Sequence, residues 1–84
     1  MRILFIKESW EDYIYWQQND KMVLKRINLL IKEIQRDHFR GIGKPEPLKH
    51  DMSGYWSRRI DDQHRLVYKI IDSNIIIAQC RYHY

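Results

Sequence analysis

The second half of the chain carries side chains that could perform acid–base chemistry on a phosphodiester. Glu46 is the only carboxylate between Asp37 and Asp51, and the lysines on both sides of it favour the ionised form that a general base needs. His83 carries an imidazole, whose unperturbed pKa of about 6.5 suits a proton donor. Arg65 adds a guanidinium, which can contact two phosphate oxygens at once. This combination fits metal-independent cleavage of RNA.

In that reaction the 2′-hydroxyl attacks its own neighbouring phosphate, so the enzyme supplies no nucleophile. It must remove the hydroxyl proton, protonate the leaving 5′-oxygen and stabilise added negative charge on phosphorus. Further cations that could assist are Lys49, Arg59 and Arg81. Tyr84 could stack on a base, a contact worth about 1–3 kcal/mol.

Each candidate also has a simpler interpretation, which the residues alone leave open. Glu46 could be a solvated loop acid paired with a lysine, and Arg59 and Arg65 could be exposed strand residues. His83 could be incidental to function. Several other chemistries are poorly matched, because one cysteine and four scattered histidines give no zinc-binding spacing and no serine lies in a nucleophile elbow. We expect no metal and no other cofactor.

Length and charge limit the classes of protein further. Eighty-four residues predict one domain, 1–84, with one core and modest stability. The net charge of +4 favours an anionic partner: nucleic acid, an acidic protein or an anionic membrane. One cysteine allows no intrachain disulfide and fits a reducing cytoplasm. No apolar run reaches the ~20 residues that a membrane-spanning helix needs.

The first half of the chain predicts a strand and two helices. Arg2 to Ile6 reads as the strand, followed by a helix that Ser9 would cap, with Asp12 at its third position. An aromatic stripe on that helix is expected in the core: Trp10, Tyr13, Ile14 and Trp16. Asp20 can cap the second helix.

The second helix has the clearest pattern in the sequence. One apolar stripe predicts its buried face: Val23, Leu24, Ile27, Leu30, Ile31 and Ile34. Lys25, Lys32 and Arg36 cluster on the opposite side, as a solvated face or a contact with RNA. Leu29, which is apolar on that polar side, hints at a partner surface.

The second half predicts an irregular segment and then three strands. Glycines and prolines between Asp37 and Asp51 exclude a regular helix or a central strand. Strands are expected over Tyr55 to Ile60, over Arg65 to Ile71, and from Ile75 to the end of the sequence. The order β-α-α-β-β-β predicts an α+β fold, with two N-terminal helices on one face of a twisted, mostly antiparallel sheet.

Alternation along these strands suggests where the candidate residues meet. Arg59 would share a face with Ser57, and Arg65 with Val67. If the last strand continues to the end of the sequence, Arg81 and His83 also point to one side. We expect all four charged residues to border a concavity on the helix-free face, although a one-residue slip in register would reverse any of them.

The sequence resembles the YoeB/Txe-type toxins of the RelE superfamily from end to end. Five segments carry the resemblance: Glu8–Tyr13, Gly43–Lys49, Ser53–Ile60, His64–Tyr68 and Cys80–Tyr84. Tyr55 and Met52 depart mildly from the family pattern, which has phenylalanine and leucine there. The departures do not touch the candidate catalytic residues.

The resemblance implies a microbial-RNase-like fold and a toxin of a toxin–antitoxin pair that cuts mRNA in the ribosomal A site. It implies that Glu46 is the general base, His83 the general acid and Arg65 the stabiliser of the charged phosphorane. It also implies that Lys49 and Arg59 assist and that Tyr84 orients the nucleotide. The expected partners are the ribosome, an antitoxin with a disordered tail, and a second copy of the chain. Within this resemblance we predict a ribosomal RNA contact at Lys25, Lys32 and Arg36.

Two other functions remain as alternatives. Toxins that poison a DNA-handling enzyme such as gyrase, without catalysis, share the superfamily fold. A plain RNA-binding module would bind mRNA and leave it intact. The complete set of Glu46, Arg65, His83 and Tyr84 argues against both, because a pure binder needs no acid–base pair.

Overall fold

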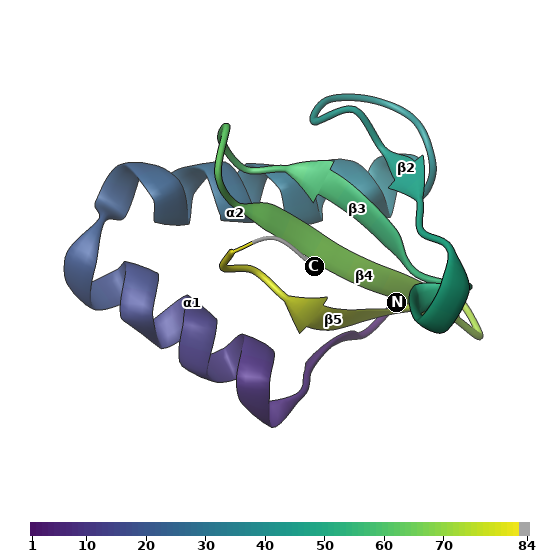
Figure 1. Ribbon diagram of the computed structural model, residues 1–84, viewed down its shortest axis with the longest axis horizontal. Helices are drawn as coiled ribbons and strands as arrows, with labels where there is room; N and C mark the ends of the chain where they lie inside the picture. The colour runs from purple at the N-terminus through teal and green to yellow at the C-terminus, as the bar shows by residue number, and fades with distance from the viewer. Residues whose placement is uncertain (83–84) are drawn as a thin grey trace.

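The computed structural model describes residues 1–82 and shows an α+β fold, as predicted. Its elements are β1 (Ile3–Phe5), α1 (Lys7–Asn19), α2 (Lys21–Arg36), β2 (Glu46–Pro47), the 3₁₀ turn η1 (His50–Met52), β3 (Trp56–Arg59), β4 (Arg65–Ile71) and β5 (Asn74–Gln79). The sheet order is β1-β5-β4-β3-β2, in which only β1 and β5 run parallel. Both helices cover the same face of the sheet (Figure 1).

The core confirms the periodicity of α2. Ile27, Leu30 and Ile34 are fully buried and pack with residues of α1 and of the last three strands. Asp20 caps α2 as predicted, since its carboxylate accepts hydrogen bonds from the backbone N–H groups of Met22 and Val23. No helix within residues 1–82 is long and apolar enough to cross a membrane.

The aromatic stripe of α1 is only partly in the core. Trp16 is buried, but Trp10 is 49% exposed and stacks on Tyr13 beside Phe5. The prediction of a core position for Trp10 is therefore wrong. Its ring lies in the first turns of α1 beside Phe5 of β1, which is the edge strand of the sheet, and half of it remains exposed.

Ser9 does not cap α1, contrary to the prediction. The helix begins at Lys7, which places Ser9 at its third position. The buried Ser9 hydroxyl accepts a hydrogen bond from the backbone N–H of Ile6 and donates one of 2.6 Å to the carbonyl of Ile77 in β5. The Ser9 side chain thus both supports the N-cap residue Ile6 and ties the helix to the sheet.

Two predictions about the strands need correction. Glu46 and Pro47 form a two-residue edge strand inside the segment expected to be irregular; Pro47 is tolerated there because an edge strand needs few donors. The last strand ends at Gln79 and does not continue to the end of the sequence. Beyond it Tyr82 has φ of +66°, a left-handed conformation that a strand cannot contain.

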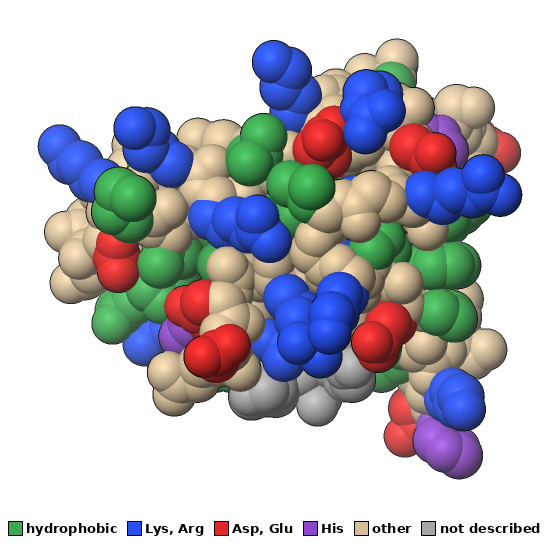
Figure 2. Space-filling view, turned by 90° about the horizontal axis from the view of Figure 1, so that it is seen from above, with side chains coloured by type: hydrophobic (Ala, Val, Ile, Leu, Met, Phe, Trp, Pro, Cys, Tyr) green, Lys and Arg blue, Asp and Glu red, His purple; other side chains and the backbone are tan. Residues whose placement is uncertain are grey.

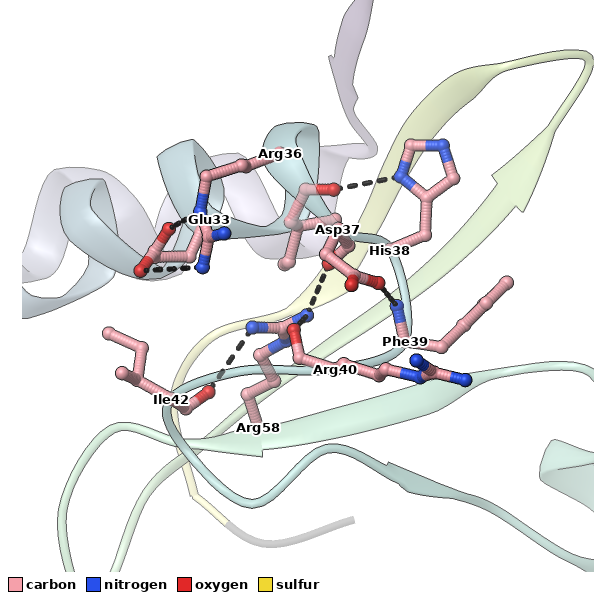
Figure 3. A network of polar contacts seen from close by, with 9 residues as sticks. Glu33, Arg36, Asp37, His38, Phe39, Arg40, Ile42 and Arg58 are labelled. Atoms are coloured by element: carbon pink, nitrogen blue, oxygen red, sulfur yellow. Dashed lines mark hydrogen bonds and ion pairs between the residues drawn. The ribbon is translucent and has the colours of Figure 1, made fainter.

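Arg58 organises the long connection between α2 and β2. Its guanidinium is fully buried and donates hydrogen bonds to the carbonyls of Asp37, Arg40 and Ile42 (Figure 3). Its Nε donates to the hydroxyl of Tyr68 in β4. One side chain thus holds three carbonyls of this connection beside the sheet, and the connection leads to Glu46.

We predict that Arg58→Met destabilises the fold by about 3 kcal/mol, because three loop carbonyls lose a charged donor while remaining away from water. Urea unfolding followed by tryptophan fluorescence would measure this. Tyr68→Phe is the milder comparison and should cost about 1 kcal/mol, since it removes one hydroxyl and leaves the guanidinium in place. Equal stability of Arg58→Met and the unmodified chain would contradict this account of the loop.

Candidate active site

The register of three strands brings the candidate base, Glu46, and two candidate cations onto one face. Glu46 in β2 pairs with Ser57 in β3, and Arg59 in β3 pairs with Arg65 in β4. Paired residues point to the same side of a sheet, as do residues two apart along a strand. Glu46, Arg59 and Arg65 therefore share the face away from the helices, as alternation predicted for the two arginines.

Strand geometry gives the scale of this arrangement. Glu46 and Arg65 are separated by two inter-strand steps and by two residues along the strand, so their Cα atoms lie about 12 Å apart. A glutamate and an arginine side chain extended toward each other can span most of that distance. A phosphodiester between them could therefore contact both.

The side chains of this face differ in how they are held. The Arg65 guanidinium donates hydrogen bonds to the carbonyls of Asp61 at 2.7 Å and His64 at 3.0 Å, which leaves further N–H donors for a ligand. Within residues 1–82, no hydrogen bond or ion pair engages the side chain of Glu46 or Arg59, and both are exposed. The Glu46 carboxylate and the Arg59 guanidinium are thus accessible to an incoming ligand.

Lys49 lies on the rim of a hollow that also includes Glu46. The hollow has a volume of about 380 Å³ and is lined by Glu46, Pro47, Leu48, Lys49, His50 and Met52. Lys49 therefore adds a positive charge beside the acid. Within the described part of the chain, no three His, Cys, Asp or Glu side chains lie close enough together to hold a metal ion.

Arg81 does not lie in the expected concavity. Its guanidinium stacks on the ring of Tyr15 in α1 at 3.5 Å from the centroid, because the chain leaves the sheet after Gln79. The two remaining candidates, His83 and Tyr84, lie outside the described residues. Of the six predicted site residues, the structure therefore places Glu46, Arg59 and Arg65 on one face and Lys49 in a hollow shared with Glu46.

The segment that leads to His83 is held by residues that the sequence analysis did not assign to the site. The Asp12 carboxylate accepts a hydrogen bond from the backbone N–H of Cys80, and the Trp16 indole donates one to the Cys80 carbonyl. His64 Nδ1 accepts one from the backbone N–H of Tyr82 at 2.7 Å. A helical spacing of four from Asp12 to Trp16 places both on one face, which is the only sequence pattern that could have linked them.

The basic row of α2 is exposed, but its charge is not uniform. Lys25 and Lys32 are exposed, whereas Arg36 forms an ion pair of 2.7 Å with Glu33. The hydrogen bond from Arg36 holds the pKa of the Glu33 carboxyl below its ordinary value. In Figure 2 basic and acidic side chains alternate over the face seen from above, so no continuous cationic surface extends across it.

Burial raises the pKa of the Asp12 carboxyl above its ordinary value of 3.8, more than the Cys80 N–H and Arg81 lower it. A raised pKa in the folded state means that the ionised form opposes folding as pH rises through that pKa. We therefore predict that Asp12→Asn gains stability relative to the unmodified chain as pH increases from below 3.8 toward neutrality. The amide oxygen of asparagine can still accept from the Cys80 N–H.

Urea unfolding of both proteins between pH 3 and pH 7 would test this, because groups common to the two cancel in the difference. Asp72→Asn, which replaces an exposed acid that does not act on the Asp12 carboxyl, is the control for loss of one carboxylate. A stability difference that stays constant or falls with rising pH would mean that burial does not dominate at Asp12.

Comparison with known proteins places the whole chain in one group. A family model described as "YoeB-like toxin of bacterial type II toxin-antitoxin system" matches residues 5–84. The chain is similar to Toxin YoeB of Streptomyces coelicolor, with 63% identity over 84 residues and 100% of both chains covered.

Solved structures agree with this in both sequence and shape. A YoeB/ParE toxin from Agrobacterium tumefaciens is 48% identical, with a TM-score of 0.98 and 100% of both chains covered. A YoeB dimer from Staphylococcus aureus and a heterotetrameric YoeB-YefM toxin-antitoxin complex from the same organism are each 53% identical, with TM-scores of 0.93 and coverage of 100% of this chain and 98% of theirs.

Proposed function

The chain belongs to the family of YoeB-like toxins of bacterial type II toxin–antitoxin systems, and we propose that it is a ribosome-dependent endoribonuclease that cuts mRNA in the A site. The observation that carries this proposal is the shared register of Glu46, Arg59 and Arg65, which places a carboxylate and two cations on the face away from the helices. A surface that only bound RNA would need the cations and would not need the Glu46 carboxylate. The arrangement therefore favours cleavage over binding alone.

Glu46 is the residue that we assign to removal of the 2′-hydroxyl proton. Its carboxylate is exposed at the edge strand, where an RNA backbone can approach without entering the core. Arg65 and Arg59 would contact the non-bridging phosphate oxygens, and Lys49 would add charge from the rim of the hollow. Three of these four residues lie in strands of the sheet, and Lys49 follows its edge strand by two positions.

His83 would protonate the leaving 5′-oxygen and Tyr84 would stack on a base, by resemblance to the family. Both residues lie outside the described part of the chain. What supports their assignment is the position of the preceding residue, since the carbonyl of Tyr82 accepts a hydrogen bond of 3.1 Å from the backbone N–H of Arg65. The main chain that leads to His83 thus passes beside a residue of the proposed phosphate site.

The proposed partners follow from the family and from charge. Relatives in Staphylococcus aureus form a dimer and a complex with the antitoxin YefM, and we propose that this chain likewise dimerises and binds an antitoxin with a disordered tail. That tail would cover the helix-free face. We propose that the protein is located in the cytoplasm and that ribosomal RNA binds Lys25, Lys32 and Arg36.

Reversal of the charge at all three of these residues should weaken ribosome binding, measured in a sedimentation assay.

Primer extension on a defined mRNA in a purified translation system would test the activity. The unmodified chain should create new mRNA ends inside codons, and both His83→Ala and Glu46→Gln should lower the cleavage rate by on the order of 100-fold to 10,000-fold, because each removes one proton-transfer group. Ribosome binding should persist in both variants. Glu11→Gln is the matched control for loss of a carboxylate and should cut normally.

Full cleavage by Glu46→Gln or by His83→Ala would refute the proposed mechanism. Toxicity that is accompanied by DNA damage and intact mRNA would instead indicate a poison of a DNA-handling enzyme. Ribosome-bound mRNA that stays intact, without DNA damage, would indicate an RNA-binding module.

A further inference from the structure

We propose that Asp12, Trp16 and His64 form a clamp on the main chain of Cys80 and Tyr82, and that this clamp positions the C-terminal residues for RNA cleavage. The inference rests on the proposed ribonuclease function and assigns positioning residues to it. We call these three side chains the C-terminal clamp. None of them lies on the helix-free face with Glu46 and Arg65.

The first half of the clamp acts on Cys80. Asp12 Oδ2 accepts from the Cys80 N–H at 3.1 Å, and Trp16 Nε1 donates to the Cys80 carbonyl at 2.8 Å. Cys80 is the first residue after β5, and both of its polar main-chain groups are thus held by α1.

The second half of the clamp acts on Tyr82. His64 Nδ1 accepts from the Tyr82 N–H at 2.7 Å, which requires a neutral imidazole with its proton on Nε2. The Tyr82 carbonyl accepts from the backbone N–H of Arg65 at 3.1 Å. Both polar main-chain groups of Tyr82 are therefore tied to the start of β4, in the two residues that include the proposed phosphate-binding arginine.

The two halves are joined through ring packing. The His64 imidazole lies edge-on to the Trp16 indole, with ring centroids 4.8 Å apart, and both side chains are buried. Between the anchored residues, Arg81 stacks on Tyr15 of α1, one residue before Trp16. Helix α1 and the β3–β4 turn thus both contact the segment from Cys80 to Tyr82 and hold it in place.

The main chain of Tyr82 is strained, and the surrounding contacts hold it in that conformation. Its φ of +66° is unfavourable for a residue with a side chain, and such a conformation persists only where the surroundings determine it. Five contacts lie around it: the hydrogen bond from its N–H, the hydrogen bonds to its carbonyl from the Arg65 N–H and the Gln79 Nε2, the ring of His64, and the guanidinium of Arg81. Strained backbone of this kind clusters at functional sites.

The chemistry explains why a clamp is needed. A general acid works only within hydrogen-bond reach of the leaving oxygen, and a displacement of about 1 Å can cost on the order of 100-fold in rate. The proposed acid, His83, directly follows Tyr82 in the sequence. Fixing the main chain of Tyr82 relative to Arg65 therefore fixes the attachment point of the acid relative to the bound phosphate.

The test compares His64→Ala with His64→Asn in single-turnover cleavage of ribosome-bound mRNA. Alanine removes the acceptor for the Tyr82 N–H, whereas the Oδ1 of asparagine is bonded to Cγ, as Nδ1 is in histidine, and can replace it. We expect His64→Ala to lower the maximal cleavage rate by on the order of 100-fold with unchanged ribosome affinity. His64→Asn should restore the rate to within about 10-fold of the unmodified chain.

Trp16→Phe provides a second variant that does not depend on His64. It keeps an aromatic ring but removes the donor to the Cys80 carbonyl, and it should lower the cleavage rate by on the order of 10-fold. Ile34→Val, a core change in α2 away from the clamp, controls for lost stability and should cut normally once folded. Amide exchange at Tyr82 should become fast in His64→Ala and remain slow in His64→Asn and Ile34→Val.

Folded His64→Ala that cuts as fast as the unmodified chain would overturn the clamp. So would a loss that asparagine does not rescue and that Ile34→Val reproduces at equal thermal stability, because the effect would then be one of stability alone. If the unmodified chain itself leaves ribosome-bound mRNA intact, the proposed function fails, which is a different result from an active parent with an unaffected His64→Ala.

Discussion

The antiparallel register of β3 against β4 is the constraint on which the rest of the molecule depends. It pairs Arg58 with Leu66 toward the helices and Arg59 with Arg65 toward the open face. A slip by one residue would exchange these faces, placing Arg59 in the core and exposing Arg58. Two neighbouring arginines, chemically identical, thus have opposite roles, one inside the scaffold and one in the proposed site.

Arg58, which points toward the helices, helps to determine the position of Glu46. Because Arg58 holds the carbonyls of the connection between α2 and β2, that connection follows the sheet edge and delivers Glu46 to the edge strand. Gly43 permits the close approach: its φ is +86°, and a Cβ there would lie 2.9 Å from Leu30 Cδ2. Its carbonyl accepts a hydrogen bond from the backbone N–H of Arg59. Stability of the loop and placement of the proposed base therefore share the same contacts.

The other side of the site depends on α1 in an analogous way. Ser9 anchors the helix to β5, and Asp12 and Trp16 then take the main-chain groups of Cys80. Burial and the nearby Asp12 charge raise the pKa of the Cys80 thiol to about 12, so this cysteine is an inert packing residue at neutral pH. Helix α1 is thereby both a layer of the core and the element that redirects the chain after β5.

The sequence by itself determined the features that depend on neighbours along the chain. The 3.6-residue apolar period of α2, the Asp20 cap and the β-branched runs of β4 and β5 were all predicted, because each is a local pattern. Resemblance of five segments identified the family and the candidate residues. Tertiary structure alone decided that Ser9 anchors rather than caps, that Trp10 is exposed and that β5 stops at Gln79. The role of Ser9 and the path of the chain after β5 involve contacts between residues 68 positions apart, Ser9 with Ile77 and Asp12 with Cys80. The exposure of Trp10 depends on which elements pack over α1. No local pattern encodes which distant groups will meet.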